Sequence, residues 1–314
     1  MPNPRDDSGT ALLRRRTLLR LTVPVAVAAA GTAALLPLLG NRDGGTGAAD
    51  TPTPAGEPGG LGSDPATRAA AAETTYADTL TARLAERIDA HLADTGTAAD
   101  VSAAASRGAL QITYNPDRRH DTASIVKAQL LVMALRHYGA VADAPDTRLR
   151  TMITASDNAA ATAVYDSLGG ADALVQACAD YGMTATEPQQ DAWGLTETTA
   201  PDQLTLLGHA LYEGLLDADQ VAYARDLMSS VAGSQDWGVS AAAADGEAVW
   251  LKNGWDTRTA LGGLWVVNTI GVLAGDTDTP TRIAVLTSGA SSQSEGVALV
   301  EAVAGLARSV LDGD

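Results

Sequence analysis

The sequence predicts an α/β protein of the α+β type, in which one antiparallel sheet is flanked by helices and joined to a helical lobe. Three observations lead to this class. Strand patterns lie towards both ends of residues 67–314, a mostly helical stretch separates them, and a helical pattern closes the chain. Strands from both ends that share one sheet, with helices covering it, give a layered architecture with the helical middle as an insert.

Hydrophobic periodicity predicts each element in turn. Apolar residues recur at every fourth position from Leu80 to Leu92, which indicates a helix that stops near Gly96. Two short segments then flank a turn at Arg107 and Gly108, as expected for a β-hairpin. The other expected ranges are hairpin strands at 101–106 and 110–114, a helix at 124–138, a helical middle at 146–225, strands at 248–252, 264–273 and 282–286, and a closing helix at 295–311.

Composition and charge exclude several classes of protein. The chain has 314 residues, 46% of them hydrophobic and one of them cysteine, which excludes a disordered chain, a collagen and a disulfide scaffold. The net charge is −17, and residues 41–314 alone carry −20, so no nucleic-acid partner is expected. With four scattered histidines, no H-E-x-x-H and no C-x-x-C, no metal site is predicted.

Residues 1–40 are predicted to direct export. Arg15 and Arg16, with two leucines close behind, resemble a twin-arginine signal, and an uncharged, alanine-rich stretch follows. About twenty apolar residues also suffice for a membrane anchor, so a cleaved signal and an anchor both remain open. Because the arginines hold the N-terminal end in the cytoplasm, the remainder is expected to be extracytoplasmic, with membrane contact only through this segment.

Residues 41–66 are predicted to form a flexible spacer. They contain seven glycines and four prolines, and such a stretch cannot bury enough apolar area to fold. Residues 67–314 then form one large domain, which we expect to be monomeric.

Lysine is used at two positions only, Lys127 and Lys252, among 21 basic residues. The first follows Ser124 by three positions at the start of a predicted helix, so the hydroxyl and the amine share a helix face. A buried lysine can remove the proton from a neighbouring serine, which makes the hydroxyl a nucleophile. Free N–H groups at the helix N-terminus would also stabilise an oxyanion.

Two further triplets have both a structural and a functional interpretation. The triplet 156–158, Ser-Asp-Asn, lies between helical stretches and is typical of a helix N-cap, but it can also supply a second hydroxyl and a substrate-binding amide. Lys252, Asn253 and Gly254 end a strand pattern. The glycine is either part of a turn or a position where a ligand approaches the backbone, with the ammonium nearby for a substrate carboxylate.

In this order, the three motifs resemble the S-x-x-K, S-D-N and K-T-G set of class A β-lactamases and penicillin-binding proteins, from about residue 70 onwards. Both lysines fall on motif positions, and residues 198–201 are similar to the threonine-rich segment after the omega loop. The resemblance implies a β-lactamase/transpeptidase-like fold and a serine hydrolase without a cofactor. The resemblance implies that Ser124 is the acylated nucleophile, Lys127 the base and Ser156 the proton relay to the leaving amine. It implies that the substrate is bound by Asn158, Lys252, Asn253 and Gly254. The N–H groups of Ser124 and Trp255 would then form the oxyanion hole.

The sequence departs from the family pattern in two places. Asn253 stands where the family usually has a hydroxyl residue, which alters one expected bond to the substrate carboxylate. The segment between residues 182 and 198 is shorter than an omega loop and has no clear E-x-x-x-N; Glu187 and Asp191 come nearest, and Glu197 is interpreted as structural. Without a carboxylate to activate water, the acyl-enzyme is expected to hydrolyse slowly.

The preferred hypothesis is an exported serine hydrolase that acts on β-lactams or on acyl-D-Ala-D-Ala peptides of the peptidoglycan type. The alternative is a wall-associated binding or regulatory protein that keeps the fold without turnover. The four histidines are assigned to the surface or to helices, and the five tryptophans mostly to core packing. Cys178 is interpreted as a small buried hydrophobe.

Overall fold

The computed structural model describes residues 65–190, 192–212, 214–274 and 277–314. These belong to the second of two units, Leu61–Asp314. The predicted export segment, residues 1–40, lies outside the described residues, as does the predicted spacer up to residue 64. Among the helices that are described, none is both long enough and apolar enough to span a bilayer.

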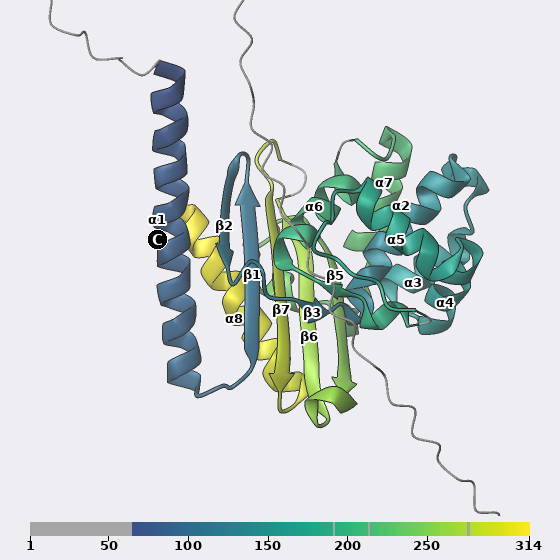
Figure 1. Cartoon of the computed structure of the whole chain (residues 1–314). Coiled ribbons are helices and arrows are strands. Elements are labelled where there is room, and N and C mark those ends of the chain that lie inside the picture. Colours follow the sequence, from purple (N-terminus) through teal and green to yellow (C-terminus); the bar gives the residue numbers. More distant parts are fainter. Residues whose placement is uncertain (1–64, 191, 213, 275–276) are drawn as a thin grey trace, which may run out of the picture. The chain divides into compact units, whose positions relative to one another are not determined.

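The described elements alternate between strands and helices much as the periodicity indicates (Figure 1). In chain order they are α1 (Pro65–Thr95), β1 (Asp100–Arg107), β2 (Leu110–Tyr114), β3 (His120–Asp121), α2 (Val126–Tyr138), α3 (Asp146–Thr154), α4 (Asn158–Ser167), α5 (Gly170–Asp180), β4 (Glu197–Thr198), α6 (Ala200–Leu211), α7 (Ala218–Ser229), β5 (Val249–Arg258), β6 (Leu264–Leu273), β7 (Thr281–Ala290) and α8 (Gln293–Asp312). The short 3-10 helices used below are η1 (Ala123–Ile125), η3 (Trp193–Leu195) and η4 (Gly233–Gln235).

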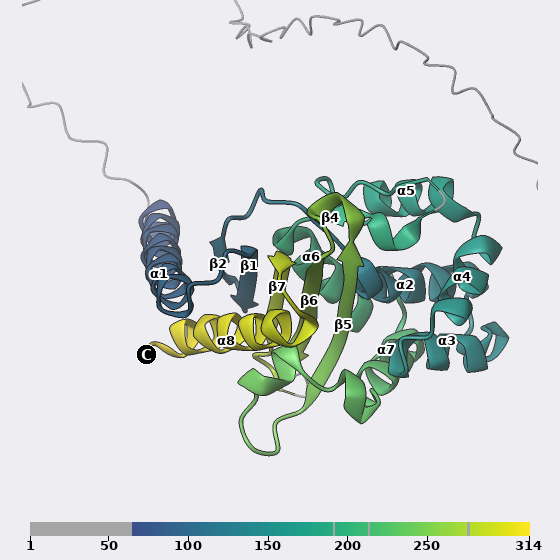
Figure 2. The same cartoon turned by 90° about the horizontal axis from the view of Figure 1, so that it is seen from below.

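Five strands form one antiparallel sheet in the order β2-β1-β7-β6-β5. Helices α1 and α8 pack beside one another on one side of the sheet, and α6 lies on the other side (Figures 1 and 2). Helices α2 to α5 and α7 gather into a lobe beyond β5 and α6 (Figure 2). The predicted α/β class, with an antiparallel sheet flanked by helices and a helical lobe, is therefore confirmed.

Side-chain alternation along the strands divides the interior into two cores. In β7, Ala284 and Leu286 pack with the helical lobe and α6, whereas Val285 packs with α1 and α8. Successive strand residues point to opposite faces, so a strand covered on both sides is apolar throughout its middle. A one-residue slip would exchange the two faces, so packing fixes the register of the sheet and hence the position of its edge strand, β5.

Several predicted boundaries differ from those in the structure. Helix α1 begins at Pro65, inside the predicted spacer 41–66. Strands β5 and β7 extend well beyond the expected ranges 248–252 and 282–286. The outer end of β5 carries polar residues, among them Asp256 and Arg258, which hide the strand pattern in the sequence. The helix expected from residue 124 starts as η1 and becomes α-helical only at Val126.

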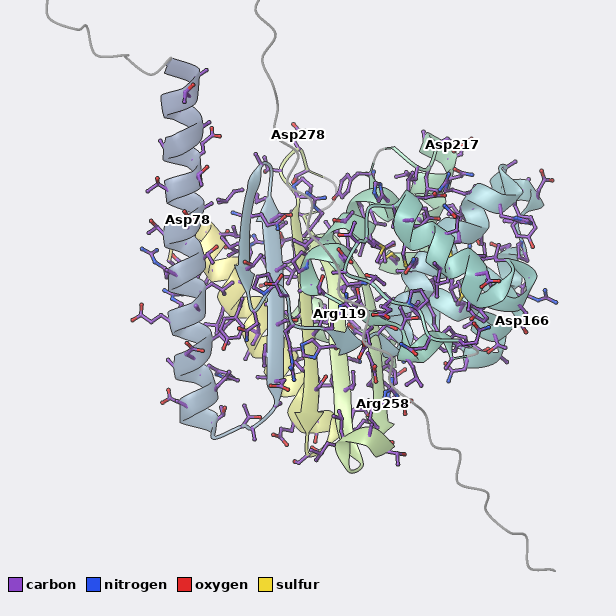
Figure 3. The ribbon with its side chains drawn as sticks, viewed as in Figure 1. Asp78, Arg119, Asp166, Asp217, Arg258 and Asp278 are labelled. Atoms are coloured by element: carbon purple, nitrogen blue, oxygen red, sulfur yellow. The ribbon has the colours of Figure 1, made fainter. Side chains whose placement is uncertain are left out.

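The negative charge is spread over the surface. Asp78, Asp166, Asp217 and Asp278 are exposed at separate places on the molecule (Figure 3). Arg258, also labelled there, is instead almost fully buried near the end of β5.

Candidate active site

Ser124 lies in η1, at the point where the chain turns into α2. Its neighbour Ala123 has a φ of 45°, which is unusual for a residue other than glycine. Such a conformation costs about 1–3 kcal/mol and tends to persist where packing enforces it, often at functional sites. The turn brings the Ser124 hydroxyl within 2.9 Å of Lys127 Nζ, as the spacing predicts.

Lys127 is fully buried in α2, and its amine is surrounded by oxygen atoms. Besides Ser124 Oγ, it reaches Ser156 O at 2.6 Å, Ser156 Oγ at 3.2 Å and Asn158 Oδ1 at 2.7 Å. Burial lowers the pKa of Lys127 from 10.5 to about 8, against a weaker opposing effect of the Asp157 carboxylate. A substantial fraction of the amine is therefore neutral near pH 8 and able to accept a proton.

Ser156 lies in the break between α3 and α4 with a φ of 56°. The next residue, Asp157, is the N-cap of α4, and its carboxylate accepts a hydrogen bond from Ala160 N at 2.6 Å. The N-cap interpretation of this triplet is therefore correct for Asp157. Ser156 Oγ is placed between the two lysine amines, 3.2 Å from Lys127 and 3.0 Å from Lys252.

Lys252 reaches the same hydroxyl from the sheet. It is 1% exposed in β5 and also donates to the carbonyl of Asn253 at 2.8 Å. Burial lowers the pKa of Lys252 well below 10.5, and the nearby Lys127 ammonium lowers it further. In the part of the chain that the structure describes, no carboxylate forms an ion pair with either lysine. A substrate carboxylate would therefore meet no competing anion at either amine, and its charge would favour the protonated form of Lys252.

Asn253 does not line the cavity beside these residues. Its side chain is fully buried, and Nδ2 donates to the carbonyls of Gln235 at 2.8 Å and Trp237 at 2.9 Å. Alternation along β5 puts Lys252 and Asn253 on opposite faces. The structure thus uses the Asn253 amide to hold η4 against the sheet, and this differs from the direct substrate contact expected from the motif.

Gly254 faces η1 at very short range. A Cβ built on Gly254 would lie 2.6 Å from Ser124 N and 2.7 Å from Ile125 N. Gly254 lies within β5 and not in a turn, and on its Cβ side the backbone that approaches is that of η1. The glycine allows β5 to support the turn that carries Ser124.

A Gly254→Ala variant is expected to be destabilised by about 1–3 kcal/mol, because the methyl group pushes β5 and η1 apart. The same shift moves Ser124 and should slow any reaction at its hydroxyl. Gly305→Ala is the matched control, because a Cβ at Gly305 in α8 meets nothing within 4 Å, and alanine favours a helix. Thermal unfolding measures both; equal melting temperatures in the two variants would contradict the packing role of Gly254.

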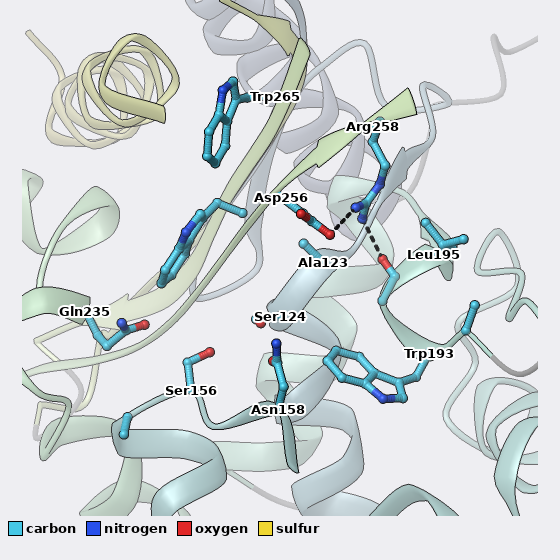
Figure 4. A pocket seen from close by; sticks show the side chains of 14 residues that line it. Ala123, Ser124, Ser156, Asn158, Trp193, Leu195, Gln235, Asp256, Arg258 and Trp265 are labelled. Atoms are coloured by element: carbon cyan, nitrogen blue, oxygen red, sulfur yellow. Dashed lines mark hydrogen bonds and ion pairs between the residues drawn. The ribbon is translucent and has the colours of Figure 1, made fainter. Parts of the chain in front are cut away.

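A cavity of about 540 Å³ opens in front of Ser124. Ser156 and Asn158 line it on one side, and Trp265 lies on the far side (Figure 4). The full lining is Ala123, Ser124, Ala155, Ser156, Asn158, Ala192, Trp193, Gly194, Leu195, Gln235, Trp255, Asp256, Arg258 and Trp265. Ser124, Ser156, Asn158 and Trp255 thus line one cavity, and Lys127 and Lys252 lie within hydrogen-bonding distance of Ser156 Oγ.

Sequence reasoning missed Arg258 and preferred core packing for most tryptophans, but Arg258, Trp193 and Trp265 all line the cavity. Three of the five tryptophans line the cavity, although most were expected in the core. Arg258 could have been found from alternation, because it lies six residues after Lys252 in the same strand and hence on the same face. Trp193 and Trp265 give no comparable signal in the sequence.

Arg258 fastens one wall of the cavity to the sheet. Its guanidinium donates to Asp121 Oδ2 and Asp256 Oδ2, each at 2.6 Å, and to the carbonyl of Gly194 at 2.9 Å (Figure 4). The side chain is 8% exposed, so these charge-assisted bonds are shielded from water. The wall formed by η3 is therefore tied directly to β5.

Glu187 lies before η3 and Glu197 lies after it, and neither forms an ion pair or a hydrogen bond with Lys127 or Lys252. Glu187 forms an ion pair with Arg119 at 2.6 Å and bridges to Glu197 through the backbone, which fits the structural interpretation of Glu197. Asp191 lies outside the described residues. Within the described ranges, no carboxylate forms a hydrogen bond with Ser124 or Lys127.

Buried polar groups elsewhere do not suggest metal chemistry. Contrary to expectation, His120 is 2% exposed, in β3, with Nδ1 2.7 Å from Ser288 Oγ. Burial lowers the pKa of His120 to about 4, so it is neutral at physiological pH. Cys178 is buried as predicted. No group of three His, Cys, Asp or Glu residues suited to a metal ion occurs among the described residues.

Comparison with solved structures defines the class of fold. A class A β-lactamase from Bacteroides cellulosilyticus DSM 14838 is 16% identical, with a TM-score of 0.66 over 75% of this chain and 99% of that chain. A β-lactamase from Burkholderia phymatum is 18% identical, with a TM-score of 0.64 over 74% and 99%. PBP-A is 18% identical, with a TM-score of 0.61 over 74% and 96%. The fold is that of class A β-lactamases.

The sequence itself also matches a known family, whose model is described as the β-lactamase enzyme family, over residues 146–311. The chain belongs to this family. The matched range includes Ser156, Asn158 and Lys252 and begins after Ser124 and Lys127. A search of curated proteins found no match.

Proposed function

We propose that this protein is an exported serine hydrolase that forms an acyl-enzyme through Ser124 with β-lactams or acyl-D-Ala-D-Ala peptides. One observation carries the proposal: a continuous chain of polar contacts joins Ser124 Oγ, Lys127 Nζ, Ser156 Oγ and Lys252 Nζ, with each step 3.2 Å or less. Such a chain can move a proton from the nucleophile to a leaving group.

In the acylation step, the neutral Lys127 amine takes the proton from Ser124, and Oγ attacks the carbonyl carbon of the substrate. The N–H groups of Ser124 and Trp255 stabilise the oxyanion. The C–N bond then breaks, and the leaving nitrogen receives a proton from Ser156 Oγ. Lys127 restores the Ser156 proton, which leaves the amine neutral again and the enzyme acylated.

The proposed substrate class is supported by the polar groups in and behind the cavity. Lys252 lies behind Ser156 without a carboxylate partner among the described residues, and this arrangement supports a substrate that carries a carboxylate beside its scissile amide. Asn158 lines the cavity and can bind the substrate amide, although its Oδ1 already accepts from Lys127. Penicillins and acyl-D-Ala-D-Ala peptides have both groups.

Deacylation is proposed to be slow. Neither Glu187 nor Glu197 forms a hydrogen bond or ion pair with Lys127, so the described residues offer no carboxylate base for water beside this amine. Export rests on the sequence of residues 1–40 alone.

The test is covalent labelling with a fluorescent penicillin, followed by a denaturing gel and mass analysis of the tryptic digest. Trypsin releases residues 120–127 as one peptide in which Ser124 is the sole serine. We expect the penicilloyl mass on this peptide and a label that persists for many minutes.

Two other outcomes contradict the proposal in different ways. No label would favour the binding or regulatory protein, which keeps the fold without the chemistry. Rapid loss of label, together with hydrolysis of a chromogenic cephalosporin, would show an efficient β-lactamase. An Asp191→Asn variant would then establish whether that carboxylate activates the water.

A further inference from the structure

The Trp193 ring lies over the Lys127 amine. Lys127 Nζ lies 5.1 Å from the centroid of the Trp193 ring, within the range of a cation–π contact. Figure 4 shows the indole beside Asn158, close to Ser124. The other neighbours of the amine are oxygen atoms of Ser124, Ser156 and Asn158.

One hydrogen bond holds the indole, and two others hold the backbone of the segment that carries it. Trp193 Nε1 donates to Thr162 Oγ1 of α4 at 3.2 Å. Gly194 O accepts from the Arg258 guanidinium at 2.9 Å. At the end of η3, the Thr196 carbonyl accepts from Thr122 N at 2.7 Å, two residues before Ser124. The aromatic wall is thus fixed to the helical lobe, to β5 and to the turn that carries the nucleophile.

We infer that Trp193 shields the ester of the acyl-enzyme from water on the side of Lys127, and that this exclusion prolongs the lifetime of the acyl group. The inference rests on the proposed acyl-enzyme and adds a residue that controls its lifetime. An apolar ring between an ester and solvent occupies the space that an attacking water molecule would need.

The step that Trp193 hinders is hydrolysis of the ester. A water oxygen bonds to the acyl carbon while one water proton passes to the Lys127 amine. The bond from the acyl carbon to Ser124 Oγ then breaks, and the proton returns from Lys127 to Oγ. The products are a free carboxylic acid and the original serine, so no further reactant is needed. The amine that serves acylation can therefore serve hydrolysis once water has room beside it.

The experiment follows the lifetime of the fluorescent penicilloyl label in the full chain after excess reagent has been removed. Trp193→Ala opens space beside Lys127, and we expect the label to be lost about tenfold faster or more, with liberation of penicilloic acid. Trp193→Phe is the matched control, because it keeps an aromatic face there. Its label should persist to within about threefold of the wild-type lifetime. Thr162→Val removes the acceptor of the indole N–H and should give an intermediate acceleration.

The outcomes separate this inference from the proposed function. Faster deacylation cannot come from misfolding, because a misfolded variant would not be acylated. If Trp193→Ala is labelled and holds its label as long as the wild type, the inference is overturned and the acyl-enzyme stands. If Trp193→Ala takes no label, Thr162→Val decides, and an unchanged lifetime there overturns the inference. If the wild type takes no label, the proposed function itself fails.

Discussion

A Ser124→Ala variant is expected to lose covalent labelling by penicillin completely while remaining folded. Ser124 Oγ lies 2.9 Å from Lys127 Nζ and faces the cavity from η1, and alanine leaves no atom there that can form an ester. Alanine suits the short helical turn, so the melting temperature should stay close to that of the wild type. A gel assay of labelling and a thermal melt measure the two properties.

The matched control is Ser230→Ala, at the exposed C-terminal end of α7. It also removes one serine hydroxyl, but at a position that does not line the cavity, so labelling should be unchanged. Residual label on Ser124→Ala, carried by another peptide of the digest, would show that Ser124 is not the nucleophile. This result would not affect the assignment of the fold, but it would contradict the assignment of Ser124 as the nucleophile.

A Lys127→Met variant is expected to be acylated about 10²- to 10⁴-fold more slowly, which is the usual contribution of a positioned general base. Methionine has a similar length and no titratable amine, so the apolar packing of α2 is largely kept. Lys127→Arg keeps the positive charge but cannot lose its proton near neutral pH. Both variants should be slow if the amine acts as a base, whereas a purely electrostatic role would leave Lys127→Arg active.

The pH dependence of wild-type acylation provides an independent measure of Lys127. Its pKa is lowered from 10.5 to about 8, and the neutral form is the reactive one. The labelling rate constant should therefore rise about tenfold per pH unit below pH 7.5 and level off above about pH 8. In Lys127→Met this rise should disappear. A wild-type profile that is flat between pH 6 and 8 would contradict the assignment of Lys127 as the base.

Much of the architecture could be predicted because it depends on local patterns. Apolar residues four positions apart, from Leu80 to Leu92, predict a helix, and the turn at Gly108 predicts a hairpin. The type of both elements is set by residues close together in the sequence. Boundaries were less accurate where polar residues interrupt the pattern, as at Asp256 and Arg258 in β5. There the strand continues because it pairs with β6, and the sequence of one strand does not show its partner.

The candidate site was predicted to different degrees for a similar reason. The approach of Ser124 to Lys127 depends on one turn of chain and was foreseeable from spacing. The burial of His120 and the contact of Trp193 with Lys127 depend on segments far apart in the sequence. The orientation of Asn253 could have been derived from strand alternation, but the motif alone suggested the cavity side.

By itself, the sequence determined which reactive groups this protein has and in which order they occur, together with the helices and strands that carry them. Tertiary structure alone decided that Ser156 Oγ lies between Lys127 and Lys252, that both amines are buried enough for their pKa values to fall, and that an indole covers one of them. The physical reason is range. Backbone propensity and side-chain periodicity act over a few residues, whereas desolvation and the meeting of distant side chains exist only once the sheet and the helical lobe have packed together.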